Sequence, residues 1–147
     1  MLSNGITIRD AITNDIADLT LLINELGYPT NVSEMEVRFK AIVNHPDYKT
    51  QVVVLNDEIV AMAGLVKGIY YEKTGGYVRI VAFVVKQSSR KKGIGKALMI
   101  AIEEWAITQN CHTLLLTSRK SSEREAAYAF YQNAGFSITS SGFVKQL

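Results

Sequence analysis

The stretch from Val84 to Leu98 constrains this chain most, because an apolar strand, a basic loop and a long helix follow one another there. Residues 77–85 form an almost wholly apolar run of β-rich residues, and residues 93–110 repeat apolar side chains at helical spacing. Gly93 and Gly95 stand where that helix is expected to begin. A strand that feeds directly into a helix is typical of α/β proteins, whose helices cover a sheet.

The remaining periodicity predicts an α/β fold with a mixed sheet in the order β-α-α-β-β-β-α-β-α-β-β. The expected strands are 5–9, 51–55, 59–71, 77–85, 113–117, 136–138 and 143–144, and the expected helices are about 16–26, 33–44, 93–110 and 123–133. Ser33 and Glu36 resemble a capping box at the start of the second helix. Gly64 inside the third strand indicates a bulge or a close backbone approach. Gly135 suits a left-handed cap after the last helix.

Length and composition predict a single domain over residues 1–147. With 48% hydrophobic and 20% charged residues, the chain is not collagen-like, low in complexity or intrinsically disordered. The lone Cys111 excludes an internal disulfide and a cysteine-built metal site, and two distant histidines argue against zinc. Apolar runs are far shorter than the ~20 residues of a membrane span, and no secretory signal is visible, so we expect a cytoplasmic protein.

Positive charge is concentrated in one segment, although the net charge is only +2. Residues 73–102 hold 7 of the 16 basic residues and none of the 14 acidic ones, so the remainder has 9 against 14, or −5. Such a distribution favours a local anionic ligand. The alternative is a solvated helix face that is merely basic.

The glycines at positions 93 and 95 favour the interpretation that this segment binds an anionic ligand. The first turn of a helix has unpaired N–H groups and a positive dipole end, and residues without side chains let phosphate oxygens approach the backbone. Around Gly93 and Gly95 stand four cations, Arg90, Lys91, Lys92 and Lys96. A pyrophosphate suits this pattern, whereas the P-loop and dinucleotide fingerprints do not match. The alternative is that the glycines allow close helix–strand packing.

Residues 90–95, Arg-Lys-Lys-Gly-Ile-Gly, resemble the [QR]-x-x-G-x-[GA] acyl-CoA signature of the GNAT superfamily of N-acetyltransferases. A second pattern of that family, A-x-x-F-Y-x-x-x-G-F, is matched by Ala127, Phe130, Tyr131, Gly135 and Phe136. The resemblance extends from about Ile6 to Leu147. It implies a mixed, splayed sheet flanked by about four helices.

The resemblance also implies a site for acetyl-CoA as co-substrate, with no metal. Phe83, Val84 and Val85 would pair with the pantetheine arm, and the Val85 N–H would polarise the thioester carbonyl. The pyrophosphate would be held by the backbone of Arg90, Lys91, Lys92, Gly93, Ile94, Gly95 and Lys96. Tyr131 would protonate the departing thiolate; its alternative is a packed helix aromatic. Arg124 stands where many relatives have Asn, and it either reaches a phosphate or is solvated.

The general base is where this sequence departs from the family. Some relatives carry Glu where this chain has Arg79, and a guanidinium cannot deprotonate an ammonium. Three alternatives remain for the proton of the acceptor amine. Water relays it, the amine arrives already neutral, or another group such as Glu72, Tyr70 or Tyr71 acts as the base. Arg79 itself would orient an anionic acceptor or pair with a nearby acid.

The acceptor pocket should be built by residues 26–48. An aromatic lining is expected from Tyr28, Phe39, His45 and Tyr48, and Glu34, Glu36 and Asp47 could attract a cation. These residues suit a small amine, a polyamine, an aminoglycoside or a peptide amine. The alternative is that the aromatics belong to the core and the acids to a solvated face.

We therefore expect an N-acetyltransferase that moves an acetyl group from acetyl-CoA to a primary amine of a small molecule or peptide by direct attack. A non-catalytic acyl-CoA-binding or sensor module is the alternative, since Arg79 replaces the usual base. Nucleic-acid binding by residues 86–96 is disfavoured, because the segment lacks interleaved aromatics and the rest of the chain is net negative. No membrane partner is expected, and a homodimer follows only by analogy with relatives.

Overall fold

The structure is a computed structural model that describes residues 5–118 and 125–147. The chain forms two compact units, one up to Leu115 and one from Leu116 to Leu147. Each unit is described by itself below.

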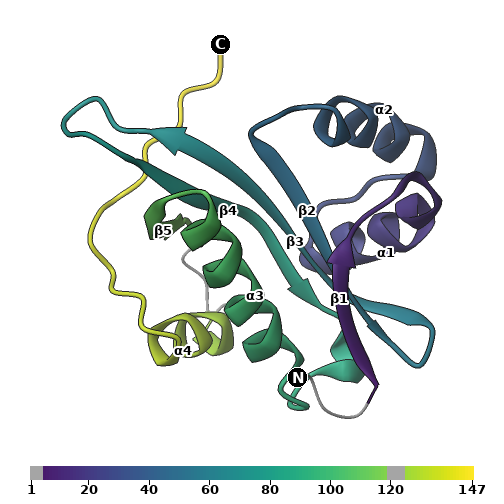
Figure 1. Cartoon of the computed structure of the whole chain (residues 1–147). Helices are drawn as coiled ribbons and strands as arrows, with labels where there is room; N and C mark the ends of the chain where they lie inside the picture. The colour runs from purple at the N-terminus through teal and green to yellow at the C-terminus, as the bar shows by residue number, and fades with distance from the viewer. Residues whose placement is uncertain (1–4, 119–124) are drawn as a thin grey trace. The chain divides into compact units, whose positions relative to one another are not determined.

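A five-stranded sheet in the order β1-β2-β3-β4-β5 is the centre of the fold (Figure 1). Its strands are β1 (Ile6–Asp10), β2 (Tyr48–Leu55), β3 (Glu58–Ile69), β4 (Gly76–Val85) and β5 (Cys111–Leu116). The first four strands pair antiparallel with their neighbours. A Cβ at Gly76 would lie 3.2 Å from Cys111 Sγ, so β4 and β5 begin side by side. Strands joined by a helical crossover pair in parallel, and the sheet is therefore mixed as predicted.

The helices of the first unit cover both faces of this sheet (Figure 1). Helices α1 (Ile16–Leu26) and α2 (Val32–Val43) lie on one face, and α3 (Ile94–Thr108) packs against β3 and β4. The face under α1 and α2 buries Leu19, Phe39, Val52, Met62 and Val84 in one hydrophobic cluster.

The first two helices begin with carboxylates at their N-termini. Asp15, just before α1, is 5% exposed and accepts hydrogen bonds from Arg9 (2.7 and 3.0 Å) and from the Ile12 N–H (2.8 Å). The hydrogen bond from Arg9 holds the pKa of Asp15 below its ordinary value. At α2 the capping box is formed by Asn31 and Glu34, and the prediction of Ser33 and Glu36 is wrong by two residues.

A β-bulge interrupts β4 at Val81. Gly64 of β3 faces Ala82, whereas the next residue, Leu65, faces Ile80, so Val81 is the extra residue. Because side chains alternate along a strand, the bulge changes which face the following residues occupy. Ala82 and Val84 consequently join the cluster under α1 and α2.

The second unit contains α4 (Glu125–Asn133), which ends in a Schellman motif. Gly135 has a φ of 98° and donates to the Gln132 carbonyl, and the Phe136 N–H donates to the Tyr131 carbonyl (both 3.0 Å). The predicted left-handed cap at Gly135 is confirmed.

The two strands predicted at 136–138 and 143–144 are wrong. Residues 134–147 form no strand, and Ile138, Phe143 and Val144 are 71%, 96% and 87% exposed. A β-rich run becomes a strand only when its backbone groups find a neighbouring strand and one face is buried. This segment has neither in the described structure.

Candidate functional site

The end of β4 directs the Val85 N–H away from β3. Val85 faces Ala61 in the ladder, and the Lys86 N–H donates to the Val60 carbonyl at 2.7 Å. This is the pattern of a non-hydrogen-bonded antiparallel pair, in which the facing residues direct their backbone groups outward. By the same alternation the Phe83 N–H points away from β3, whereas Val84 is a buried core residue.

The loop after β4 is held by three contacts within the first unit. Lys86 forms an ion pair with Glu58 (2.6 Å), and the Gln87 N–H donates to Glu25 Oε1 of α1 (3.0 Å). The hydrogen bond with Glu58 raises the pKa of Lys86 and lowers that of Glu58. Arg90 Nε donates to the Val85 carbonyl (3.0 Å), on the strand side that faces away from β3. The sequence analysis missed Glu25 and Glu58, since both contacts join residues far apart in the chain.

Helix α3 begins after Gly93, and the left-handed backbone at this position explains why it is a glycine. Gly93 is its N-cap with a φ of 78°, and no side chain of residues 5–118 or 125–147 caps the helix. An added Cβ at Gly93 would meet nothing within 4 Å. Close packing is therefore not the reason for this glycine, and the space that its side chain would occupy is open.

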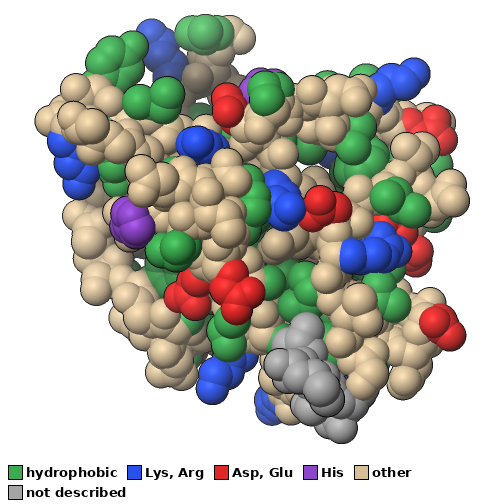
Figure 2. Space-filling view, viewed as in Figure 1, with side chains coloured by type: hydrophobic (Ala, Val, Ile, Leu, Met, Phe, Trp, Pro, Cys, Tyr) green, Lys and Arg blue, Asp and Glu red, His purple; other side chains and the backbone are tan. Residues whose placement is uncertain are grey.

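Three lysines around this first turn carry uncompensated charge. Lys91, Lys92 and Lys96 are exposed, and no carboxylate in residues 5–118 or 125–147 forms an ion pair with them. On the face that Figure 2 draws, basic and acidic side chains are intermixed. The open first turn with its unpaired cations is the arrangement that binds an anion.

Tyr131 lies on α4 of the second unit, half-buried between two aromatic neighbours. Its ring packs edge-to-face on Phe130 (5.6 Å between centroids) and on Phe136 (5.8 Å). The Tyr131–Phe136 contact joins the two positions that Schellman motifs commonly pair, so the cap itself accounts for two aromatic residues of the pattern. The predicted phosphate contact of Arg124 falls outside the described residues.

The candidates for a general base are far from Val85 along β4. Tyr70, Tyr71 and Glu72 lie in the hairpin before Gly76, at the opposite end of the 10-residue strand. At about 3.3 Å per residue that separation is roughly 30 Å, too long for proton transfer at Val85. Arg79 lies within β4, with its guanidinium 6.0 Å from the centre of the Tyr77 ring.

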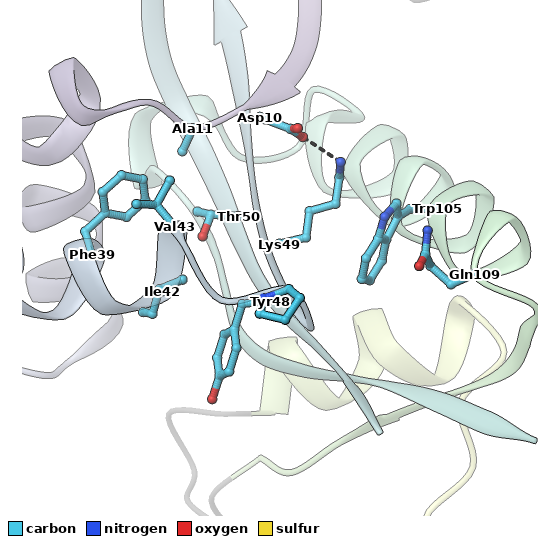
Figure 3. Close-up of a pocket in the computed structure, with 11 residues that line it drawn as sticks. Asp10, Ala11, Phe39, Ile42, Val43, Tyr48, Lys49, Thr50, Trp105 and Gln109 are labelled. Carbon is cyan, nitrogen blue, oxygen red and sulfur yellow. Dashed lines mark ion pairs between the residues drawn. The ribbon is translucent and has the colours of Figure 1, made fainter. Parts of the chain in front are cut away.

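Two adjacent pockets lie in the first unit. The α2 cavity, about 150 Å³, lies between α1, α2 and the sheet, and its walls include Ile23, Met35, Phe39, Met62, Gly64 and Val81. The β2-edge pocket, about 270 Å³, is more open and includes Asp10, Tyr48, Lys49, Thr50, Trp105 and Gln109 (Figure 3). Lys49 pairs with Asp10 (2.7 Å) and lies over the Trp105 ring. Phe39, Ile42, Tyr48 and Thr50 line both pockets.

The predicted acceptor lining is only partly present. Phe39 and Tyr48 line both pockets, whereas Tyr28 and His45 line neither. Glu34 caps α2, and neither Glu36 nor Asp47 lines either of these two pockets. The sequence analysis missed the strand side of the cavity, for which Gly64 was the available signal.

No helix among the described residues has the length and apolarity needed to cross a membrane. The same residues contain no group of three His, Cys, Asp or Glu side chains arranged to hold a metal ion.

Comparisons with known proteins agree with this geometry. The model of the acetyltransferase (GNAT) family matches residues 15–136. A GNAT family acetyltransferase from Staphylococcus aureus has a similar structure, with a TM-score of 0.83 and 35% identity over 97% of this chain and 99% of that one. No curated protein matched this sequence.

Two more distant structures show the fold alone. Glucosamine-6-phosphate N-acetyltransferase from Arabidopsis thaliana has a TM-score of 0.80 at 21% identity, covering 96% of this chain and 97% of that one. The aminoglycoside N-acetyltransferase AAC(6')-Iy, solved in complex with CoA, has a TM-score of 0.85 at 16% identity, covering 100% and 99%.

Proposed function

Since this chain belongs to the acetyltransferase (GNAT) family, we propose that it moves an acetyl group from acetyl-CoA to a primary amine of a small molecule or peptide. The open, uncapped first turn of α3 after Gly93 carries the proposal, because it presents backbone donors and unpaired cations together. We assign the pyrophosphate of acetyl-CoA to residues 90–96.

The acetyl end of the co-substrate is assigned to the outward side of β4. The Val85 N–H points away from β3 and suits pairing with the pantetheine arm. The assignment of Phe83 and Val84 to the same arm stays a prediction. A donor such as the Val85 N–H stabilises the oxyanion that forms when the amine nitrogen attacks the thioester carbonyl. One such donor contributes about 10²- to 10³-fold in rate.

The step ends when the C–S bond breaks and the thiolate takes a proton, which we assign to Tyr131. A phenol has a pKa of about 10 and recovers its proton from solvent. The amine is expected to attack in its neutral form, with its proton leaving through water. A cytoplasmic location and a homodimer stay predictions.

An assay of thiol release from acetyl-CoA across a panel of amines, with calorimetric titration of acetyl-CoA, tests this function. Wild type should bind acetyl-CoA and release thiol only when an acceptor is present. Tyr131→Phe keeps the ring contact with Phe136, so it should fold and bind acetyl-CoA normally while turnover falls about 10²-fold or more. Acetyl-CoA binding without thiol release for any amine would favour the non-catalytic acyl-CoA-binding module instead.

A further inference from the structure

We propose that the α2 cavity receives a compact apolar group carried by the acceptor amine, and that the acceptor is not a polycation. The inference rests on the proposed function, because it names the class of amine that the same enzyme acetylates. It goes beyond that function in assigning a subsite.

The cavity has the size and lining of a site for an apolar group. Its volume is about 150 Å³, and its lining is aliphatic, aromatic or thioether apart from a few residues. A dry cavity of about this size, lined by Leu, Ile and Phe, holds a benzene molecule. Two of the lining side chains are Met35 and Met62, and methionine adapts to ligands of different shape.

Gly64, in the wall of the cavity, lies opposite the β-bulge at Val81, a place where strands often carry glycine. Its φ lies outside the left-handed region, and an added Cβ would make only ordinary contacts of 3.5 Å with Ala82 and Val81. Gly68 and Gly76 of this hairpin differ, since a Cβ at Gly68 would overlap the Tyr77 ring and one at Gly76 would lie 2.6 Å from the Gly68 carbonyl. Alanine therefore fits at position 64, whereas a larger side chain would extend into the cavity that Gly64 lines.

The charge of the lining argues against a polycationic acceptor. Among the described residues that line the α2 cavity, Arg38 is the only charged one. A polyamine or an aminoglycoside would meet no carboxylate there and would lose hydration without compensation. An amine with one nitrogen and an apolar end avoids this cost.

The cavity also lies on the strand that carries the proposed chemistry. Val81 and Ala82 of β4 line it, and Val85 follows on the same strand. An amine anchored in the cavity through its apolar end therefore extends along the strand that bears the proposed oxyanion donor.

The first experiment uses the methionine methyl groups as reporters. Wild type labelled with ¹³C-methyl methionine is titrated with 2-phenylethylamine, 4-phenylbutylamine and spermidine, and NMR spectra are recorded. The phenylalkylamines should shift the methyl signals of Met35 and Met62, while Met99 on α3, which lines neither pocket, stays unchanged. Absence of shifts at Met35 and Met62, or equal shifts with spermidine, would overturn the inference.

The second experiment fills the cavity through Gly64→Ala and Gly64→Val, with Gly142→Val as the control at a glycine whose Cβ would meet nothing within 4 Å. Both Gly64 variants should keep the acetyl-CoA affinity, and Gly64→Ala should melt no lower than wild type. Gly64→Val should bind 4-phenylbutylamine about ten- to a hundredfold more weakly, with Gly64→Ala in between. If Gly64→Val fails to fold, Gly64→Ala decides alone.

The two proposals fail separately. Normal acetyl-CoA binding with unchanged amine affinity in the Gly64 variants overturns the cavity assignment and leaves the acetyltransferase standing. Shifts at Met35 and Met62 in a protein that binds no acetyl-CoA support the apolar subsite and overturn the proposed function.

Discussion

Helices α2 and α3 begin in opposite ways. At α2 the Asn31 side chain accepts the Glu34 N–H (2.9 Å), and the Glu34 carboxylate accepts the Asn31 N–H (3.2 Å). At α3 a left-handed glycine precedes a first turn that no described side chain caps, and lysines instead of acids lie in and before this turn. A capped first turn serves the stability of its own helix, whereas an uncapped cationic one leaves its donors for a ligand.

The largest expected effect comes from giving α3 the negative charge that α2 has. Gly93→Glu combined with Gly95→Glu should weaken acetyl-CoA binding by about a hundredfold or more, since carboxylates repel the pyrophosphate and strain the left-handed turn. Calorimetric titration measures the loss, and Ser33→Glu in the first turn of α2 is the matched control. Retained micromolar binding in the double variant would remove α3 from the site.

Asp15 extends the comparison to the start of α1. Asp15→Asn should lower the free energy of unfolding by about 1.5–3 kcal/mol, as expected for hydrogen bonds to a charged group. The lower end is favoured because the Arg9 side chain is 39% exposed. Denaturant unfolding measures the change, and acetyl-CoA affinity should stay at the wild-type value.

The same carboxylate gives the stability a defined pH dependence. Because the pKa of Asp15 is lowered in the folded state, its contribution is present above the ordinary Asp value of about 3.9 and is lost as the pH falls through the folded value. Wild type should therefore lose part of its advantage over Asp15→Asn below about pH 4. A difference in stability that stays constant from pH 7 to pH 3 would contradict this.

Removing the cap of α2 should have a smaller effect. Asn31→Ala should cost about 1 kcal/mol of stability. Acetyl-CoA affinity should be unchanged, because this cap belongs to the helix alone. A parallel loss of affinity, measured by calorimetry, would show that the two helix starts are coupled.

The smallest effect is expected from single cations beside α3. Lys92→Gln and Lys96→Gln should each weaken acetyl-CoA binding about two- to fivefold, the range expected for one exposed charge near a helix terminus. The loss should shrink as salt is added. Lys40→Gln on α2 is the control, and an equal loss there would mean that net charge alone is being measured.

Much of the fold could be predicted because its signals are local. The bounds of α1 and α4 follow from apolar periodicity and from Gly27 and Gly135, which cap them with left-handed backbones. The start of α3 could be predicted for the same reason. The local pattern after Gly135 was not enough to predict strands, because a strand needs a neighbouring strand that is distant in sequence.

Only the part of the site that is contiguous in sequence could be predicted. The loop that contains Gly93 is contiguous in sequence, whereas the α2 cavity combines side chains from two helices and three strands. A side chain at position 64 would contact Ala82 and Val81 on the neighbouring strand. The sequence around Gly64 therefore cannot show whether this position needs a glycine.

The extra residue at Val81 has a consequence for how β4 can change in evolution. It acts as a phase shift, since every residue after it is displaced by half a side-chain period relative to a regular ladder opposite β3. Deleting one residue there would turn Ala82 and Val84 toward α3 and their neighbours toward α2 in a single step. A substitution in this strand changes one side chain at a time. A deletion of one residue instead exchanges the two faces of the sheet for all four residues 82–85 at once.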